Sequence, residues 1–195
     1  MHPLLFSTFL LPTIIKCTSL VDQTISDLDQ SDPRLATFIK DKLLEPPPIF
    51  PENVEISLET EKNININKFF YRQVGKDHFW RDRLLWTDKE WKKYIDNKNL
   101  ETGIMKINNE LVGFYEQEFH KNQNEVELIQ MGILKEHQGK KLGSFLLQYI
   151  IQTAHDRDIE RLYVHTCSLD HKYALNNYLS KGLKIFKKEE IDFIL

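Results

Sequence analysis

One stretch of the chain, residues 125–166, restricts the possible folds more than any other. A β-type run at 125–134 leads through a Gly- and Lys-rich turn into residues 139–157, where apolar side chains recur at helical spacing. A second β-type run follows at 161–166. A strand, a helix and a strand in this order form a right-handed crossover between parallel strands. The stretch therefore predicts an α/β protein with at least one parallel pair.

The segments around this unit predict mostly antiparallel neighbours. Runs at 54–58, 102–107 and 111–118 have strand character, and the last two are joined by a polar turn. A first helix is predicted at 65–74 and a third at 173–180. Between them a second helix is predicted to begin after Thr87, its N-cap, with Glu90 completing a capping box. A last strand region is predicted at 183–195. We expect a mixed, mostly antiparallel central sheet with helices on both faces, an α+β variant of the α/β class.

The first 50 residues form an N-terminal extension to a domain at 51–195. Asp32 and Pro33 are helix-start signals for 33–44, and the proline-rich segment 45–51 reads as a stiff linker. The apolar first fifteen residues lack a basic residue before the apolar run and are interrupted by Pro3 and Pro12. They are also too short to cross a bilayer, so we expect neither export nor membrane association.

Composition narrows the functional classes. The chain has 195 residues and a net charge of −3, which fits one core with an appendage and no basic stripe for nucleic acid. Cys17 and Cys167, the two cysteines, are far apart in sequence and indicate a reducing compartment. We expect a cytoplasmic protein that does not bind nucleic acid; its oligomeric state stays open, and a homodimer is compatible with the sequence.

The turn between the strand and the long helix has the chemistry of a phosphate site. The first turn of a helix carries N–H groups without helical partners and a partial positive charge. Gly139 and Gly143 let the backbone approach an anion, Lys140 and Lys141 add charge, and Ser144 adds a hydroxyl donor. Alone, such a turn is common on protein surfaces, so its context decides its meaning.

That context resembles the GNAT superfamily of N-acyltransferases over roughly 140 residues. The family turn Q/R-x-x-G-x-G/A is similar to QGKKLG here, with Gln138 and Gly143 in place and Lys141 at the middle glycine. Downstream, ALNNYLSKGLKIF resembles a second family segment and places Tyr178 and Gly182 in register. The segments YRQVG, WRDR, ELIQMGIL and VHTCSLDH look closest to a poorly characterised bacterial group of that superfamily.

The resemblance implies an acetyl-CoA-dependent N-acetyltransferase that transfers the acetyl group directly to an amine. It implies that the parallel strands splay apart and leave the backbone of Met131, Gly132 and Ile133 free for the pantetheine arm. The Ile133 N–H would be the donor to the thioester oxygen, and Gly132 would suit a β-bulge. In the family the turn at 138–144 holds the pyrophosphate.

The resemblance also implies an acid and a base. Glu127 lies eleven residues before Gln138, the offset of the catalytic glutamate in the histone-acetyltransferase branch, whereas Glu116 and Glu125 are weaker alternatives. Tyr178 would protonate the departing thiolate. Each also has a plain structural interpretation, as a solvated strand carboxylate and as a core tyrosine.

The acceptor predicted is a primary amine of a small molecule. Trp80 and Arg83 fall between two helices that border the acceptor pocket in the family, and an arginine there can pair with an acceptor carboxylate. Asp170 and His171 fall where many relatives have an asparagine, and they either orient the substrate or cap the next helix. A protein or peptide acetyltransferase and a non-catalytic acyl-CoA sensor are the alternatives.

A metal site and a covalent intermediate are the remaining interpretations. His165, Cys167 and His171 form an H-x-C-x3-H pattern that lacks a nearby fourth ligand, so we expect no metal. Cys167 has the chemistry of an acyl-carrying nucleophile, but a buried thiol beside the cofactor cleft is the simpler interpretation.

Overall fold

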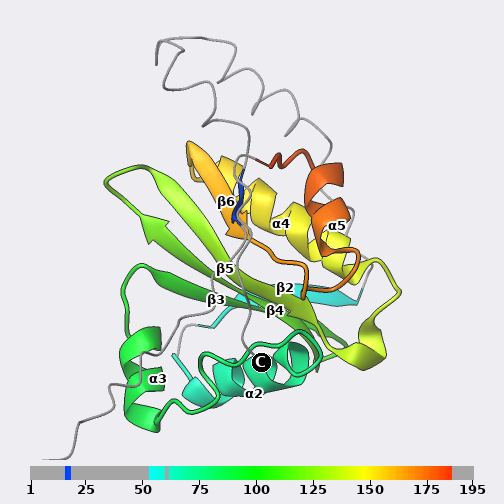
Figure 1. The fold of residues 1–195 in the computed structure, drawn as a ribbon. Coiled ribbons are helices and arrows are strands. Elements are labelled where there is room, and N and C mark those ends of the chain that lie inside the picture. The colour runs from blue at the N-terminus through cyan, green and yellow to red at the C-terminus, as the bar shows by residue number, and fades with distance from the viewer. Residues whose placement is uncertain (1–15, 19–52, 60–61, 186–195) are drawn as a thin grey trace, which may run out of the picture.

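The computed structural model describes residues 16–18, 53–59 and 62–185, and a six-stranded sheet runs through its centre (Figure 1). The strands lie in the order β1-β6-β5-β4-β3-β2. Three consecutive strands form the predicted antiparallel meander: β3 (Leu100–Ile107), β4 (Glu110–His120) and β5 (Glu125–Ile133).

Shorter strands extend the meander on both sides. β2 (Val54–Leu58) pairs antiparallel with β3, and β6 (Arg161–His165) pairs parallel with β5. A segment of the N-terminal extension, β1 (Lys16–Thr18), pairs antiparallel with the outer edge of β6. Within the described residues the pair β5–β6 is the single parallel one, as the crossover predicted.

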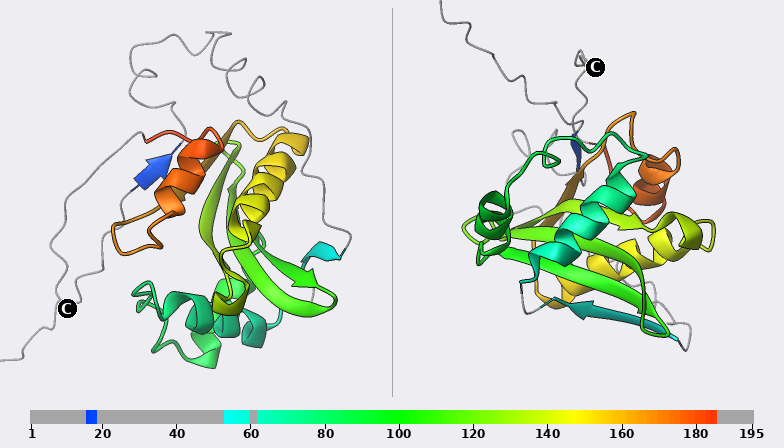
Figure 2. Two further views of the ribbon diagram at one scale, coloured as in Figure 1. Left: turned by 90° about the vertical axis from the view of Figure 1, so that its right-hand side faces the viewer. Right: turned by 90° about the horizontal axis from the view of Figure 1, so that it is seen from below.

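Helices cover both faces of the sheet (Figure 2). α2 (Ile64–Gly75) and α3 (Asp88–Ile95) lie below it in the view of Figure 1. α4 (Leu142–Asp156) and α5 (Ala174–Ser180) lie above it. This arrangement confirms the predicted α/β class with a mostly antiparallel mixed sheet.

Local sequence signals account for several boundaries. Thr87 is the N-cap of α3, where its backbone N–H donates to the Glu90 carboxylate at 2.7 Å and its hydroxyl accepts from the Glu90 N–H. Asn108 and Asn109 turn β3 into β4 with φ values of 51° and 67°. Two successive positive φ values suit the right-handed twist of the flanking strands, and asparagine tolerates them better than most residues.

The two faces of the sheet hold separate apolar clusters. On the upper face Leu146, Leu147 and Ile150 of α4 are fully buried against strand residues such as Leu128. On the lower face the Phe70 ring of α2 stacks on Phe114 of β4 with centroids 4.8 Å apart. β4 and β5 therefore lie between two packed layers, and β5 contributes Glu127 and residues 129–133 to the site.

Some predictions fall outside the described residues. These are the helix at 33–44, the linker at 45–51 and most of the last strand region. Residues 183–185, the described part of that region, are not a strand. No helix in the described part of the chain combines the length and the apolar character of a membrane span.

Candidate active site

The parallel strands β5 and β6 are paired over only part of their length. Their register runs from Glu125 opposite Arg161 to Leu128 opposite Val164 and stops there. β5 continues to Ile133 and stays paired with β4 throughout. The splay implied by the family resemblance is therefore a property of this fold.

The backbone of β5 offers hydrogen-bonding groups to this gap. The Leu134 N–H donates to the Val112 carbonyl of β4 at 2.8 Å. Because successive residues of a strand point their N–H groups to opposite sides, those of Met131 and Ile133 point away from β4, into the gap. The Ile133 carbonyl accepts from the Gln138 side-chain amide at 3.1 Å, which ties the following turn to the strand end.

The β-bulge of β5 lies at Ile129, and its prediction at Gly132 is wrong. Gln130 is opposite Glu116 while Leu128 is opposite Gln117, so Ile129 is the extra residue. A bulge bends the strand locally, and this one lies just beyond Leu128, where pairing with β6 ends. Gly132 serves close packing instead, since a Cβ there would come within 2.3 Å of Val74 Cγ1 in α2.

The Gly- and Lys-rich turn reaches α4 through two left-handed residues. Gly139 has φ 76° and Lys141 has φ 60°. The first α4 hydrogen bond runs from the Phe145 N–H to the Lys141 carbonyl at 3.1 Å, so the N–H groups of Leu142, Gly143 and Ser144 belong to the open first turn. The helix thus begins three residues later than predicted.

Lys141 occupies the position where the left-handed region favours glycine. It is the left-handed N-cap of α4. Such a conformation costs a non-glycine residue on the order of 1 kcal/mol. The Lys141, Lys140 and Gly139 positions are exposed, and a Cβ on Gly139 would meet nothing within 4 Å. The turn therefore leaves room for an anion in front of α4.

One cavity of about 990 Å³ joins this turn to the remaining predicted residues. Its lining includes five residues of the turn and the start of α4, three of β5 with one of α5, and five from the loops and β5: Gln138, Gly139, Lys141, Gly143 and Ser144; Met131, Gly132, Ile133 and Tyr178; Trp80, Arg83, Glu127, Asp170 and His171. Lys140 lies on the exposed side of the turn. The fold thus brings together residues that are up to 98 positions apart in sequence, counting from Trp80 to Tyr178.

Glu127 reaches the cavity from β5 and is held on both carboxylate oxygens. Oε1 lies 3.3 Å from His165 Nε2, while Oε2 lies 3.4 Å from His120 Nε2 and accepts from the Tyr163 hydroxyl at 3.2 Å. Its side chain keeps 25% of its exposure. Sequence reasoning missed His120 and Tyr163, because only the strand register brings them to Glu127.

The two alternative carboxylates are engaged elsewhere. Glu116 is fully buried and accepts from Asn67 Nδ2 at 2.7 Å, Tyr94 OH at 2.7 Å and Arg83 Nη1 at 3.0 Å. Glu125 forms an ion pair with Arg161 at 2.7 Å. Of the three, Glu127 is the one that lines the cavity.

Arg83 lies at the cavity wall with its charge already balanced. It is 7% exposed, its guanidinium lies over the Tyr94 ring at 4.2 Å, and Asp82 approaches its Nε at 3.5 Å in addition to Glu116. Burial, followed by the Glu116 charge, raises the pKa of Tyr94 well above its usual range, so that hydroxyl remains a donor. This buried ion pair makes Arg83 a support of the pocket wall rather than an available cation.

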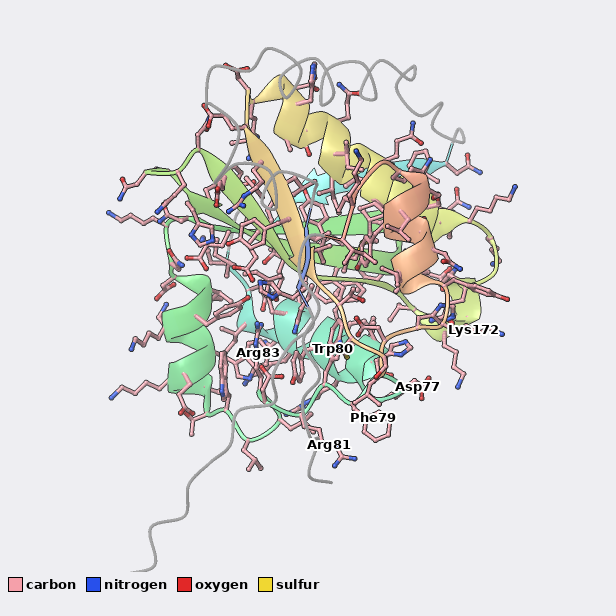
Figure 3. The ribbon with its side chains drawn as sticks, turned by 45° about the horizontal axis from the view of Figure 1, so that its top comes forward. Asp77, Phe79, Trp80, Arg81, Arg83 and Lys172 are labelled. Carbon is pink, nitrogen blue, oxygen red and sulfur yellow. The ribbon has the colours of Figure 1, made fainter. Side chains whose placement is uncertain are left out.

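Trp80 closes the wall next to Arg83 (Figure 3). Its backbone N–H donates to the Gly75 carbonyl at 3.2 Å. Its ring centroid lies 5.7 Å from that of Tyr71 and 6.3 Å from that of Phe114. A Cβ on Gly75 would come within 2.5 Å of Trp80 Cβ. The glycine at the end of α2 therefore lets the loop fold back against the helix.

Asp170 and His171 belong to the loop between β6 and α5. Asp170 Oδ2 accepts from Thr166 Oγ1 at 2.7 Å and from the Cys167 N–H at 3.1 Å. His171 lies with its ring 5.8 Å from His78 in the α2–α3 loop. The N-cap residue of α5 is Tyr173, and no side-chain hydrogen bond caps this helix. Asp170 therefore does not have the second of its two predicted roles, that of capping the helix.

The Cys167 thiol lies in the cavity wall and does not have the character of an activated nucleophile. Burial, and then the Asp170 charge, raises the pKa of the Cys167 thiol, which disfavours the thiolate. In the part of the chain that the structure describes, no three His, Cys, Asp or Glu side chains converge as metal ligands. The thiol is half-buried in the cavity wall.

Tyr178 lies on the α5 side of the gap. It is 7% exposed, packs in the upper apolar cluster and lines the cavity together with Ile133. Asn177, next to it, donates to the Gly143 carbonyl at 3.4 Å and so links α5 to the first turn of α4. This link fixes Tyr178 relative to the anion site.

Comparison with known proteins identifies the family of the chain. Residues 60–182 match the family described as the acetyltransferase (GNAT) family. A search of the curated proteins gave no match.

Solved structures of the family superimpose on the chain at low sequence identity. An aminoglycoside acetyltransferase from an uncultured soil metagenomic sample aligns with TM-score 0.56 and 15% identity over 73% of this chain and 94% of its own. An IAA acetyltransferase from Bacillus cereus aligns with TM-score 0.54 and 19% identity over 69% and 79%. The ribosomal-protein-S18-alanine N-acetyltransferase from Escherichia coli aligns with TM-score 0.53 and 16% identity over 66% and 76%. These likenesses concern the fold, and with the match over residues 60–182 they lead to one conclusion: the chain belongs to the GNAT acetyltransferase family.

Proposed function

We propose that the protein is an acetyl-CoA-dependent N-acetyltransferase that acetylates a primary amine of a small molecule by direct transfer within a ternary complex. The observation that carries the proposal is the continuous cavity that runs from the open first turn of α4, past the gap-facing amides of β5, to the Glu127 carboxylate. Donor and acceptor enter such a cavity from opposite ends and meet beside Ile133.

The donor end suits coenzyme A. The first-turn amides of α4 and the Lys141 charge would hold the pyrophosphate, and Gly139 leaves the approach open. The Met131 and Ile133 backbone would pair with the pantetheine arm as a missing strand does. The Ile133 N–H would then stabilise the oxyanion that forms on the thioester, an effect worth about 3 kcal/mol for one donor.

The acceptor end suits an amine that arrives protonated. An alkyl ammonium with a pKa of about 10.4 is neutral in roughly one of 2,500 molecules at pH 7, which adds about 4.6 kcal/mol to the barrier. Glu127, partly exposed in the wall, is placed to take that proton. The second amine proton, lost as the amide forms, would reach the thiolate through Tyr178.

The loops around the acceptor end favour a small substrate. The α2–α3 loop with Trp80 and the β6–α5 loop with Lys172 lie close to one another (Figure 3). Their contact between His78 and His171 narrows one side of the entrance. A small amine fits such a space more readily than an extended polypeptide, with Trp80 and the Asp170–His171 segment as its walls.

The test measures binding and turnover on the same preparation. Acetyl-CoA and CoA are titrated by calorimetry, and free-thiol release is followed with spermidine, kanamycin and a short peptide that begins with alanine. We expect binding of both nucleotides and turnover with a small amine. Turnover with the peptide alone would favour a protein acetyltransferase, and binding without turnover would favour a sensor.

A charge variant separates the cofactor site from the fold. Ser144→Asp places a negative charge in the first turn of α4, where it stabilises the helix but repels a pyrophosphate. We expect its Kd for acetyl-CoA to rise at least tenfold. The matched control is Asn122→Asp, the same charge change at an exposed position of the β4–β5 turn. Equal Kd values for the two variants would contradict the assignment of the anion site.

A further inference from the structure

Glu127 is the centre of a four-residue cluster, and the proposed reaction uses none of its other three members. The cluster, which we call the carboxylate clamp, consists of His120, Glu127, Tyr163 and His165. They come from three adjacent strands, β4, β5 and β6. Two imidazole nitrogens and one hydroxyl lie within 3.4 Å of the carboxylate oxygens.

The strand register builds the clamp. Glu127 is directly opposite Tyr163 in the parallel pair, and His165 lies two residues further along the same face. His120 stacks on the Tyr163 ring with centroids 5.9 Å apart and an interplanar angle of 16°. Tyr163 in turn meets His165 edge to face at 5.8 Å. These contacts fix both imidazoles relative to the carboxylate.

The clamp has a side that faces the cavity. Glu127 and His165 both line it, so their contact at Oε1 lies where an acceptor amine would arrive. His120 and Tyr163 contact the other oxygen, Oε2. A carboxylate offers about four lone-pair positions, and in the tautomer of His165 that accepts a proton at Nε2 this imidazole occupies none of them, so Oε1 keeps positions for an ammonium group.

A carboxylate alone retains an amine proton poorly. The ordinary pKa is about 4.3 for a glutamate and about 6.5 for a histidine, so a shared proton favours the imidazole by roughly 160-fold. His165 is the neighbour that lines the cavity and touches Oε1. We propose that His165 is the proton-accepting partner of Glu127, with His120 positioning the carboxylate from Oε2; this inference rests on the proposed function.

The proton transfer conserves atoms and charge. An N–H bond of the acceptor ammonium breaks as an O–H bond forms on Glu127, and the proton moves to Nε2 of a neutral His165 that carries its hydrogen on Nδ1. Glu127 returns to the carboxylate and stabilises the imidazolium. After acetyl transfer His165 releases this proton to solvent, while the second amine proton ends on the CoA thiol. A resting imidazolium cannot accept a proton, so activity falls when His165 is protonated beforehand.

The other charged groups around the clamp do not take this role. Burial, and then the Glu127 charge, raises the pKa of Tyr163 well above its usual range, so its hydroxyl remains a neutral donor. Glu125 is paired with Arg161 at 2.7 Å, and Glu118 accepts from Asn97 Nδ2 at 2.7 Å. On the outer edge of β6, Lys16 of β1 is the register partner of His165.

The experiment measures kcat of the full chain between pH 5 and pH 9 by free-thiol release. It uses saturating acetyl-CoA and whichever of spermidine, kanamycin and the alanine-initiated peptide reacts fastest. The pH dependence of kcat reports groups that titrate in the ternary complex. We expect wild-type kcat to decline as the pH falls through the range in which imidazoles gain a proton, and the decline in His165→Gln to move to lower pH. At pH 8 we expect kcat of His165→Gln to be about tenfold lower.

Three further variants distinguish the possible outcomes. His120→Gln removes an imidazole that positions the carboxylate, so it should lower kcat and leave the acceptor KM unchanged, which keeps the inference testable if His165→Gln folds poorly. His155→Gln changes an exposed histidine of α4 beside Asp156 and should match the wild type. Glu127→Gln should lower kcat at least about a hundredfold and keep acetyl-CoA binding.

The result that overturns the inference differs from the one that overturns the proposed function. If Glu127→Gln is inactive while both histidine variants keep the wild-type pH profile, His165 does not accept the proton and Glu127 alone is the base. If Glu127→Gln is fully active, neither Glu127 nor His165 has the proposed role. Absence of thiol release with all three acceptors removes the proposed function itself.

Discussion

Two carboxylates on the lower face of the sheet have the same number of partners but differ in burial and in the kind of partner. Glu116 and His120 are four residues apart on β4 and therefore share that face, and His120 reaches Glu127 from there. Glu116 is 0% exposed and is held by Asn67, Tyr94 and Arg83. Glu127 keeps a quarter of its exposure and is held by His120, Tyr163 and His165.

The difference lies in the kind of partner. Arg83 is a permanent cation, so the Glu116 cluster has a fixed positive partner. Imidazoles gain and lose a proton near neutral pH, so the clamp around Glu127 has several charge states within reach. The first arrangement holds helices α2 and α3 to the sheet, whereas the second can move protons. Substitutions that separate stability from turnover test this distinction.

The largest expected effect is on the stability of the Glu116 cluster. Arg83→Met leaves a buried carboxylate without its cation, which typically costs about 3–5 kcal/mol. Urea denaturation followed by circular dichroism measures the loss in free energy of unfolding. The double variant Arg83→Met with Glu116→Gln removes the stranded charge and should recover part of that loss. An Arg83→Met protein as stable as the wild type would erase the contrast between the two carboxylates.

The converse effect is expected at Glu127. Glu127→Gln should change the free energy of unfolding by less than about 1 kcal/mol, because the side chain is partly exposed and glutamine keeps its size and one oxygen. Its kcat should fall at least about a hundredfold, equivalent to about 2.7 kcal/mol of barrier, as for the loss of a general base. Thiol release and urea denaturation on the same sample give both numbers. A large stability loss with unchanged kcat would place Glu127 in the same structural class as Glu116.

A matched pair of tyrosines sharpens the comparison at smaller amplitude. Tyr94→Phe removes a donor from the fully buried Glu116 and should cost about 1–3 kcal/mol of stability. Tyr163→Phe removes a donor from Glu127 and should cost less than about 1 kcal/mol while lowering kcat severalfold. Thermal unfolding of the two variants, recorded side by side, ranks the stabilities. Equal losses in the two variants would show that burial does not separate the clusters.

How far the sequence predicted these features depends on the range of the interactions. Local signals sufficed for α3, where Thr87 and Glu90 form the predicted capping box, and for the β3–β4 turn. Alternating polarity and the order of segments sufficed for the meander and the parallel pair. The beginning of α4 was placed three residues early, because an amphipathic pattern does not reveal the left-handed residues Gly139 and Lys141.

The candidate site was less accessible to sequence reasoning because strand register and burial decide it. The bulge falls at Ile129 instead of Gly132, and only the pairing of β4 with β5 shows this. Arg83 lies in the loop from which a contact with the acceptor was predicted, but its guanidinium is bound to Glu116, 33 residues away in sequence. Residues His120 and Tyr163 reach Glu127 through pairing across three strands. A motif centred on single residues does not contain such partners.

The smallest expected effect concerns Lys141, which belongs to neither carboxylate cluster and tests whether the two ends of the cavity are independent. With φ 60°, Lys141 carries left-handed strain that glycine lacks, so Lys141→Gly should stabilise the fold by up to about 1 kcal/mol. The lost charge and the closer backbone approach oppose each other at the anion site, so the Kd for acetyl-CoA should change less than about threefold, within the range of one exposed charge.

The control is Lys140→Gly, which removes the same charge at a neighbouring position that is not among the described residues of positive φ, and should destabilise the protein slightly. Denaturation and calorimetry compare the two variants, and the pH profile of kcat should be the same in both, since the Glu127 clamp lies at the far end of the cavity. If Lys141→Gly destabilised the protein as much as Lys140→Gly does, the left-handed conformation would not make this position favour glycine. If Lys141→Gly shifted the pH profile, the two ends of the cavity would be coupled.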